Sequence, residues 1–256
     1  MDTDGYVVIH DVLSPNEIVT ARDLFNKWKL SGIHVENNGI IKNNSGHQEH
    51  AWYIRTRPAV QNIFKNLLNT DDLIVSFDGC CYMDKDSKYE GVWTHVDQST
   101  ENLNFRCYQG LVSLTNNVEK TIVLYNGTHL LYEDYVNKYN KKVKCNFHFI
   151  ENDYLKTCTK SVIKVNAGSM VVWDSRTFHQ NQCGINNEDR MVQYISYMPK
   201  DHPDNTLENK QKRLYAFEER ITSTHWSAPI RYINPSYKSS YIGNLDPYIK
   251  DIMNIL

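Results

Sequence analysis

The sequence predicts a mainly β domain, a sandwich or barrel, with helices packed around it. Two helical segments come first, followed by short strands rich in β-branched and aromatic residues, and then by another helix. Neither a GxGxxG nor a GxxxxGK[ST] motif occurs, so the phosphate-binding loops of alternating α/β folds are absent. The order of elements therefore favours a β core buttressed by helices.

One core accounts for the whole chain. Its 256 residues are 41% hydrophobic, which is enough to bury a single sizeable core. No repeat, low-complexity tract or Pro/Gly-rich linker divides it. We expect one domain over residues 1–256, made of a helical buttress (1–70), a β core (71–200) and a C-terminal helical or extended segment (201–256).

The N-terminal elements have recognisable boundaries. Residues 6–9 predict a short strand, and Ser14, Pro15 and Glu17 have the spacing of a helix cap with proline in the first turn. A second helix is expected near Pro58, and the Asn-rich stretch 36–48 is expected to be a mobile loop. The apolar residues after Ser14 recur at helical spacing: Ile18, Ala21, Leu24, Phe25 and Trp28.

The remaining elements are mostly strands. They are short, apolar and separated by Gly, Asn and Asp, as strands of an antiparallel core are. The expected strands cover residues 73–77, 108–114, 121–125, 162–165, 170–173 and 191–198. Two more helices are expected over 130–139 and 207–219.

Charge and cysteine usage narrow the class of protein. The 28 basic and 30 acidic residues nearly balance, so nucleic acid is not an expected partner. No apolar run is long enough to span a membrane, and the acidic N-terminus does not read as a secretory signal. The 6 cysteines are scattered without a CxxC pair, which indicates reduced thiols. We expect a cytoplasmic protein, and the oligomeric state stays open.

A His-x-Asp pair lies between two expected strands. If the chain is extended there, His95 and Asp97 point to the same face and can bind one cation together. Alone, the pair can equally be an aspartate that orients a histidine at a strand end. A second histidine, His179, follows the buried strand 170–173. Two histidines and one carboxylate form the facial triad that binds ferrous iron and leaves three positions open.

Arg190 begins the strand that follows His179. Its planar guanidinium suits the distal carboxylate of a 2-oxo diacid. The alternative is that Arg190 pairs with the adjacent Glu188 or Asp189, or ends a strand.

Together these pieces resemble the iron(II)- and 2-oxoglutarate-dependent dioxygenases of the phytanoyl-CoA dioxygenase type. The resemblance covers residues 4–200, with a fainter trace at Thr224-His225-Trp226. The segments that carry it are Asp4-Gly5-Tyr6-Val7-Val8, Val75-Ser76-Phe77-Asp78-Gly79, Trp93-Thr94-His95-Val96-Asp97-Gln98, Gln109-Gly110, Asn126-Gly127-Thr128-His129 and Trp173-Asp174-Ser175-Arg176-Thr177-Phe178-His179.

The resemblance implies a double-stranded β-helix, a cupin-like jelly-roll barrel, with iron(II) bound by His95, Asp97 and His179. It implies that Arg190 binds 2-oxoglutarate, the cosubstrate that is used with O₂, and that succinate and CO₂ are released as a small-molecule substrate is hydroxylated. Asp97 stands where halogenases of this family have a small residue, which favours hydroxylation. Further candidates for contact with the cosubstrate or substrate are Gln109, Tyr82, Gln98 and Tyr108.

Two other functions stay open at this level. A metal-dependent barrel enzyme could retain the triad without using 2-oxoglutarate, and a non-catalytic jelly-roll binding module could retain the fold alone. Succinate production would separate the first from an oxygenase. The complete His-Asp-His-Arg set argues against the second.

Overall fold

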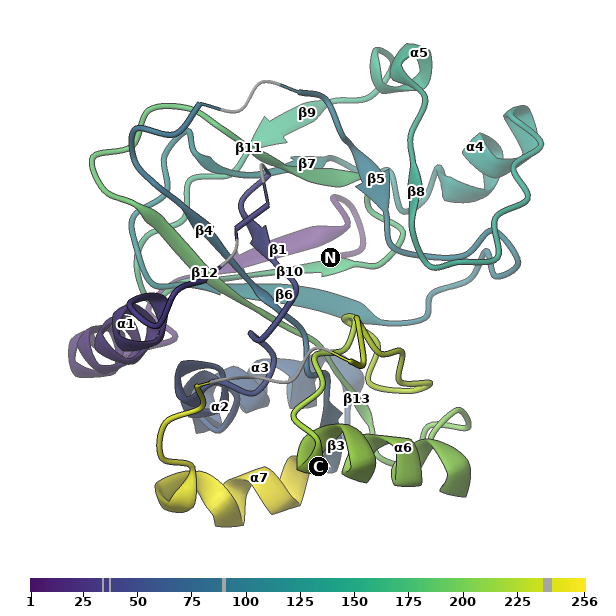
Figure 1. The fold of residues 1–256 in the computed structure, drawn as a ribbon. Helices are drawn as coiled ribbons and strands as arrows, with labels where there is room; N and C mark the ends of the chain where they lie inside the picture. The colour runs from purple at the N-terminus through teal and green to yellow at the C-terminus, as the bar shows by residue number, and fades with distance from the viewer. Residues whose placement is uncertain (34, 37, 89–90, 237–240) are drawn as a thin grey trace.

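Two antiparallel sheets stack on each other in the computed structural model, which describes residues 1–33, 35–36, 38–88, 91–236 and 241–256 (Figure 1). The larger sheet has the order β1-β10-β6-β12-β4-β2, and the smaller one has the order β8-β5-β11-β7-β9. The strands of the larger sheet are β1 (Tyr6–Ile9), β10 (Met170–Asp174), β6 (Tyr108–Ser113), β12 (Arg190–Ile195), β4 (Cys80–Met83) and β2 (Ile40–Ile41). Those of the smaller sheet are β8 (His148–Phe149), β5 (His95–Val96), β11 (His179–Gln182), β7 (Thr121–Tyr125) and β9 (Lys160–Val162).

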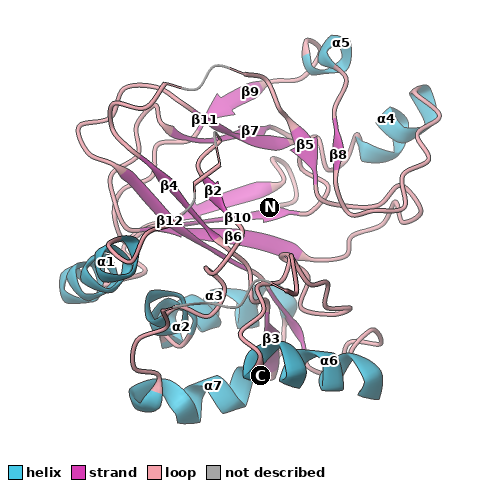
Figure 2. Cartoon of the chain, in the orientation of Figure 1, coloured by secondary structure: helices cyan, strands magenta, loops and turns pink. Residues whose placement is uncertain are grey.

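Helices cover the outer face of the larger sheet (Figure 2). A two-stranded ribbon of β3 (Leu73–Val75) and β13 (Tyr197–Pro199) lies among them. The helices of this layer are α1 (Pro15–Lys29), α2 (Glu49–Arg55), α3 (Pro58–Leu68), α6 (Leu207–Glu218) and α7 (Ile249–Ile255), the last preceded by a 3₁₀ turn at Asp246–Tyr248. Two short helices, α4 (Tyr132–Lys138) and α5 (Asn152–Leu155), lie beside the smaller sheet.

Side-chain alternation along the strands directs neighbouring residues into different apolar clusters. Cys80 of β4 packs with the helices outside the larger sheet, and its neighbour Cys81 packs in the cluster between the sheets. That inner cluster also takes Trp173 from the larger sheet and Leu124 from the smaller one. The space between the sheets is therefore apolar at one end, and the strand ends that carry polar residues surround the other.

The helix start and most strand positions predicted from sequence are confirmed. Ser14 and Glu17 form a capping box at the start of α1, with the Glu17 carboxylate accepting from the Ser14 amide at 2.9 Å. The strands 6–9 and 121–125 have the predicted bounds. The predicted strand 191–198 is instead divided into β12 and β13, which belong to different sheets.

The stretch 36–48 differs from the expected loop. Ile40–Ile41 pairs with β4 as an edge strand, and residues 45–48 are buried. Residue 37 of this stretch lies outside the described part of the chain. A Cβ atom added to Gly46 would lie 2.3 Å from the carbonyl oxygen of Phe77. The two backbones therefore approach each other closely, which explains this burial. Asn-rich composition therefore did not indicate exposure here, because the backbone is enclosed by neighbouring segments.

Within the described residues, none of the helices is long and apolar enough to cross a membrane.

Candidate metal centre

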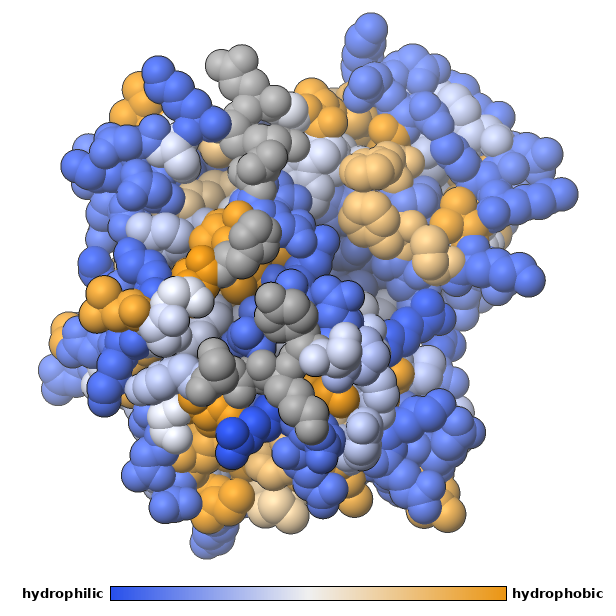
Figure 3. Space-filling view, viewed as in Figure 1, coloured by the Kyte–Doolittle hydropathy of each residue, from blue (hydrophilic) through white to orange (hydrophobic). Residues whose placement is uncertain are grey.

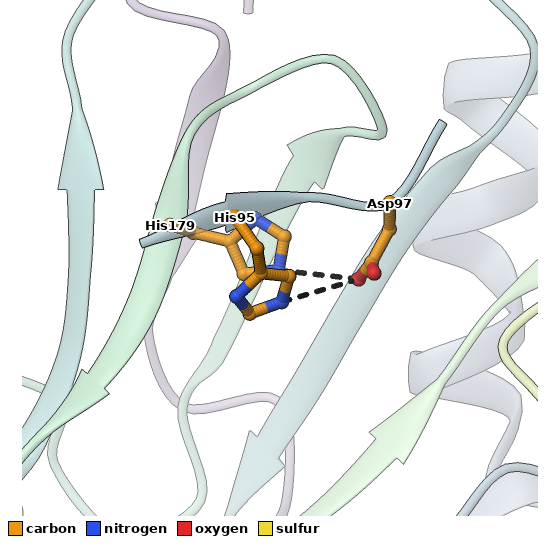
Figure 4. A group of neighbouring side chains, drawn as sticks. All are labelled: His95, Asp97 and His179. Carbon is orange, nitrogen blue, oxygen red and sulfur yellow. Dashed lines mark ion pairs between the residues drawn. The ribbon is translucent and has the colours of Figure 1, made fainter. Parts of the chain in front are cut away.

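Strand pairing brings the two histidines of the predicted triad together. His179 of β11 lies directly opposite His95 of β5 in the smaller sheet. Opposed residues of an antiparallel pair point to the same face, so both imidazoles lie on one side of the sheet. Asp97 follows β5 two residues after His95 and points to the same place, as Figure 4 shows.

The three side chains converge on one point. The Asp97 Oδ2 atom lies 3.6 Å from His95 Nε2 and 3.3 Å from His179 Nε2. One ligand atom from each residue lies within 4.8 Å of the others, the spacing that a single bound cation requires. Two imidazole nitrogens and one carboxylate oxygen form the donor set of the facial triad, so these residues fit a ferrous ion.

Backbone carbonyls orient both imidazoles. His95 Nδ1 lies 3.1 Å from the carbonyl oxygen of Trp93, and His179 Nδ1 lies 2.9 Å from that of Thr177. A ring that donates from Nδ1 to a carbonyl keeps its proton there, which leaves the Nε2 lone pair free for a metal. Burial and the nearby His179 lower the pKa of His95, which favours the neutral imidazole that a metal ligand requires.

A chain of hydrogen bonds holds the carboxylate. Gln109 donates from Nε2 to Asp97 Oδ2 at 2.8 Å, and Trp173 donates from Nε1 to Gln109 Oε1 at 3.0 Å. Gln109 and Trp173 are register partners on β6 and β10, which explains why their side chains meet. Burial favours the neutral acid, but the adjacent His95, His225 and His179 hold the pKa of Asp97 well below its usual range.

A cavity of about 630 Å³ opens over the triad. It is lined by the triad and by residues from both sheets and from the C-terminal segment. Besides the triad, these are Asn38, Ile40, Lys42, Asp78, Trp93, Gln109, Ile122, Phe147, Phe149, Trp173, Asn181, Tyr194, Thr224, His225 and Ile233. A site of this size accommodates a small organic molecule in addition to a cosubstrate.

Arg190 is a buried cation that has no counter-ion among the described residues. The neighbours that could have paired with it are engaged elsewhere: Glu188 with Arg22 at 3.1 Å, and Asp189 with Lys29 at 3.9 Å. Arg190 forms no ion pair with any residue that the structure describes; its NH1 group contacts Cys81 Sγ at 3.1 Å, and its buried Nε has no hydrogen-bond partner. Such a cation is costly unless an anion joins it.

The inward face of β12 carries this arginine. Arg190 and Tyr194 are four residues apart on the strand, so they point to the same face, and Tyr194 lines the cavity. Val192 between them packs in the cluster between the sheets. The guanidinium therefore lies between the sheets beyond Tyr194.

Of the further candidates from sequence, Gln109 alone lines the cavity. Tyr82 is on the helix-covered face of β4, where its hydroxyl donates to Asp189 at 2.8 Å. Gln98 is buried, and its side-chain amide donates to the carbonyl oxygens of Asn102 and Asn104. The backbone carbonyl of Tyr108 accepts a hydrogen bond from the hydroxyl of Ser196. The structure thus brings Gln109 to the candidate metal ligands and places Tyr82 outside the cavity.

His225 and Asp78 are among the cavity residues that were not predicted as site residues. His225 lies in the C-terminal segment, with Nε2 3.2 Å from the Asp97 carbonyl oxygen and Nδ1 4.0 Å from Asp97 Oδ2. Burial lowers the pKa of His225 to about 4. Asp78 is a second carboxylate in the cavity. Two signals in the sequence could have indicated them: the resemblance at Thr224-His225-Trp226, and the place of Asp78 after an expected strand. Neither residue, however, has a neighbour along the sequence that marks it as part of the site.

No protein-family model matches the chain. The Ava biosynthesis cluster protein O of Aspergillus versicolor is 28% identical over 200 residues, a match that covers 70% of this chain and 63% of that protein. The match thus spans less than two thirds of that relative's length.

Solved structures share the fold. SnoK, a non-heme α-ketoglutarate-dependent carbocyclase of nogalamycin biosynthesis, superposes with a TM-score of 0.57 at 19% identity, over 77% of this chain and 81% of SnoK. HygX from Streptomyces hygroscopicus, solved with nickel and 2-oxoglutarate, gives 0.56 at 13% identity, over 78% and 85%. EctD from S. alaskensis, solved with 2-oxoglutarate and 5-hydroxyectoine, gives 0.55 at 14% identity, over 77% and 72%. The chain has the jelly-roll fold of the non-heme 2-oxoglutarate-dependent oxygenases, which confirms the fold class predicted from sequence.

Proposed function

We propose that this chain is an iron(II)- and 2-oxoglutarate-dependent oxygenase that hydroxylates a small molecule. The observation that carries the proposal is the convergence of His95, Asp97 and His179 in one cavity. The unpaired, buried Arg190 beyond Tyr194 supports the choice of cosubstrate, since a dicarboxylate supplies the anion that the guanidinium lacks.

Iron(II) bound by the triad would supply the coupled use of O₂ and 2-oxoglutarate, which yields succinate, CO₂ and a hydroxylated substrate. The protein's part is positioning. The imidazoles of His95 and His179 present their Nε2 atoms, and Gln109 holds the Asp97 carboxylate in one orientation. The ring of Trp93 stacks on His95 with centroids 4.8 Å apart, and so shields one side of the ligand from water.

We propose that the reaction is a hydroxylation. The solved structures with this fold include a carbocyclase and an epimerase, SnoK and SnoN. Asp97 supplies the carboxylate that hydroxylases of this type require, and the cavity leaves room for a substrate beside the triad. We also propose membership of the phytanoyl-CoA dioxygenase type, on the motifs of residues 4–200.

A cytoplasmic location is likewise proposed. All six cysteines are free thiols, and the adjacent Cys80 and Cys81 are both buried. Free thiols in this number are typical of a reducing compartment.

The test is anaerobic reconstitution with Fe(II) and 2-oxoglutarate, followed by O₂ and a panel of small-molecule substrates, with succinate measured. We expect succinate release that needs Fe(II) and is lost in His179→Ala, while His10→Ala, a change at an exposed histidine, retains it. Metal binding without 2-oxoglutarate binding would instead favour the metal-dependent enzyme. Binding of neither would favour a non-catalytic module.

A further inference from the structure

Asp78 is a carboxylate that the proposed chemistry does not use. It lines the cavity, where its Oδ1 atom accepts a hydrogen bond from the Gly79 amide at 2.7 Å. It forms no ion pair with any other residue in the described ranges of the chain. Burial raises the pKa of Asp78 to about 7, although the nearby Arg55 opposes that rise.

The cations around Asp78 are directed elsewhere. Arg55 donates from NH2 to the backbone carbonyl of Asp78 at 2.8 Å, and from NH1 to the carbonyl of Gly46. Lys42, at the edge of the cavity, pairs with Glu36 at 3.0 Å. Among the described residues, the Asp78 carboxylate therefore lines the cavity without an ion-pair partner.

The charges of the proposed iron(II) and cosubstrate site balance without Asp78, so its carboxylate is available to bind the substrate. Iron(II) and Arg190 bring three positive charges, and Asp97 and the two carboxylates of 2-oxoglutarate bring three negative charges. These charges cancel, and Asp78 is a further carboxylate that lines the cavity. The cation described beside it, Arg55, donates to the backbone carbonyl of Asp78 and not to its carboxylate. A buried carboxylate is stabilised when a cation with hydrogen-bond donors meets it.

Aromatic side chains form an apolar part of the lining of the same cavity. Trp93, Phe147 and Phe149 line it, with the Phe147 ring 4.9 Å from that of His95. Phe147 and Phe149 are 40% and 58% exposed, so their rings offer apolar surface beside the cavity that a ligand can cover. Figure 3 shows apolar side chains gathered over β5 and β8 beside a hollow in the surface.

We infer that the substrate is an amine, a molecule with an apolar body that carries a protonated nitrogen. Asp78 binds the ammonium group, and Trp93, Phe147 and Phe149 bind the apolar body. That this amine is a substrate rests on the proposed function, but binding of the amine requires neither iron nor turnover.

Binding to the metal-free protein tests it. The probes are 2-phenylethylammonium, its neutral counterpart 2-phenylethanol and its anionic counterpart 3-phenylpropanoate, followed by ligand-observed NMR at about pH 8, where the amine is protonated. The variant Asp78→Asn keeps the acceptor for the Gly79 amide and removes the charge. Asp84→Asn is the matched control, because it removes one exposed carboxylate outside the cavity. Asp97→Asn shows whether the ammonium binds at the metal ligands instead.

A charge-assisted hydrogen bond predicts that the ammonium binds about 10- to 150-fold more tightly than the alcohol. Asp78→Asn should remove that preference, and Asp84→Asn should retain it. Equal affinities for the three probes would overturn the inference, and so would a preference that survives Asp78→Asn and disappears in Asp97→Asn. Because 2-oxoglutarate plays no part, a failed succinate assay leaves this result standing by itself.

Discussion

The Gln109 amide lies 2.8 Å from the Oδ2 atom of Asp97, the oxygen that also faces both histidines of the triad. The Gln109 side chain is itself fixed by the Trp173 indole. The Asp97 carboxylate, a candidate metal ligand, is therefore oriented by two residues of the larger sheet, whereas both histidines of the triad lie on the smaller one. The two sheets are thus coupled at the metal site.

Removing that bond should weaken metal binding. Gln109→Leu leaves the Asp97 carboxylate free to rotate, and loss of such an orienting partner typically costs 10- to 100-fold in metal affinity. Trp173→Phe removes only the indole donor behind Gln109, so a smaller loss is expected. Anaerobic Co(II) titration followed by visible absorption measures both. Unchanged affinity in Gln109→Leu would show that the carboxylate needs no partner.

The triad itself should be required for metal but not for folding. His95→Ala and His179→Ala each remove one of three ligands, so tight Fe(II) binding should be lost while the far-UV circular dichroism is retained. Asp97→Ala should abolish hydroxylation even where some iron stays bound. The control is His10→Ala, an exposed histidine remote in sequence from the triad. Full iron occupancy and turnover in both histidine variants would refute the assignment.

Arg190 should control cosubstrate affinity and not iron affinity. Arg190→Met removes a charge-assisted bond and should weaken 2-oxoglutarate binding about 10- to 150-fold. Arg190→Lys should recover part of that loss, because it keeps the charge without the two-pronged geometry. The metal-to-ligand absorption band of the anaerobic Fe(II) complex reports the affinity. Arg22→Met, which breaks an exposed ion pair, is the control and should bind normally.

The same variant makes a stability prediction. Because Arg190 is fully buried and has no ion pair among the described residues, replacing it by methionine removes an uncompensated charge. We expect the metal-free Arg190→Met protein to melt at the same temperature as the parent or higher. A marked fall in melting temperature would mean that the guanidinium stabilises the fold, and would count against a role in binding the carboxylate of 2-oxoglutarate.

Acid should destabilise the fold through two buried histidines. His50 packs on Phe25 and Trp28, and His47 packs on Phe77. Burial, with a smaller effect of Arg55, lowers the pKa of both to about 3. Between that value and the ordinary pKa of about 6.5, the unfolded chain binds more protons than the folded one. Their contribution is therefore complete above about pH 6.5 and is lost as the pH falls toward 3.

The slope can be measured by urea unfolding at several pH values. Each histidine should contribute about 1.4 kcal/mol per pH unit within that window. His50→Leu should remove one such contribution and flatten the dependence, whereas His10→Leu should leave it unchanged. An unaltered slope in His50→Leu would show that the His50 ring accepts a proton in the folded state.

The sequence by itself predicted the local elements and the candidate metal ligands. The capping box of Ser14 and Glu17 and the strand at 121–125 depend on neighbours along the chain, so local patterns predict them. His95 and Asp97 were identified because their two-residue spacing places them on one face of an extended strand.

Tertiary structure decided which other side chains reach the site. Gln109 and Tyr82 were equivalent candidates in the sequence, but alternate strand positions and the helix layer direct Tyr82 to the outer face of β4. Asp78 and His225 enter the cavity from segments far apart along the chain. Their proximity to Asp97 arises from sheet pairing and the return of the C-terminal segment, and such long-range packing leaves no periodic trace in the sequence. Arg190 depends on both levels. Its residue type predicted that it binds an anion, and the tertiary structure decided that Glu188 and Asp189 pair with Arg22 and Lys29 instead of with Arg190.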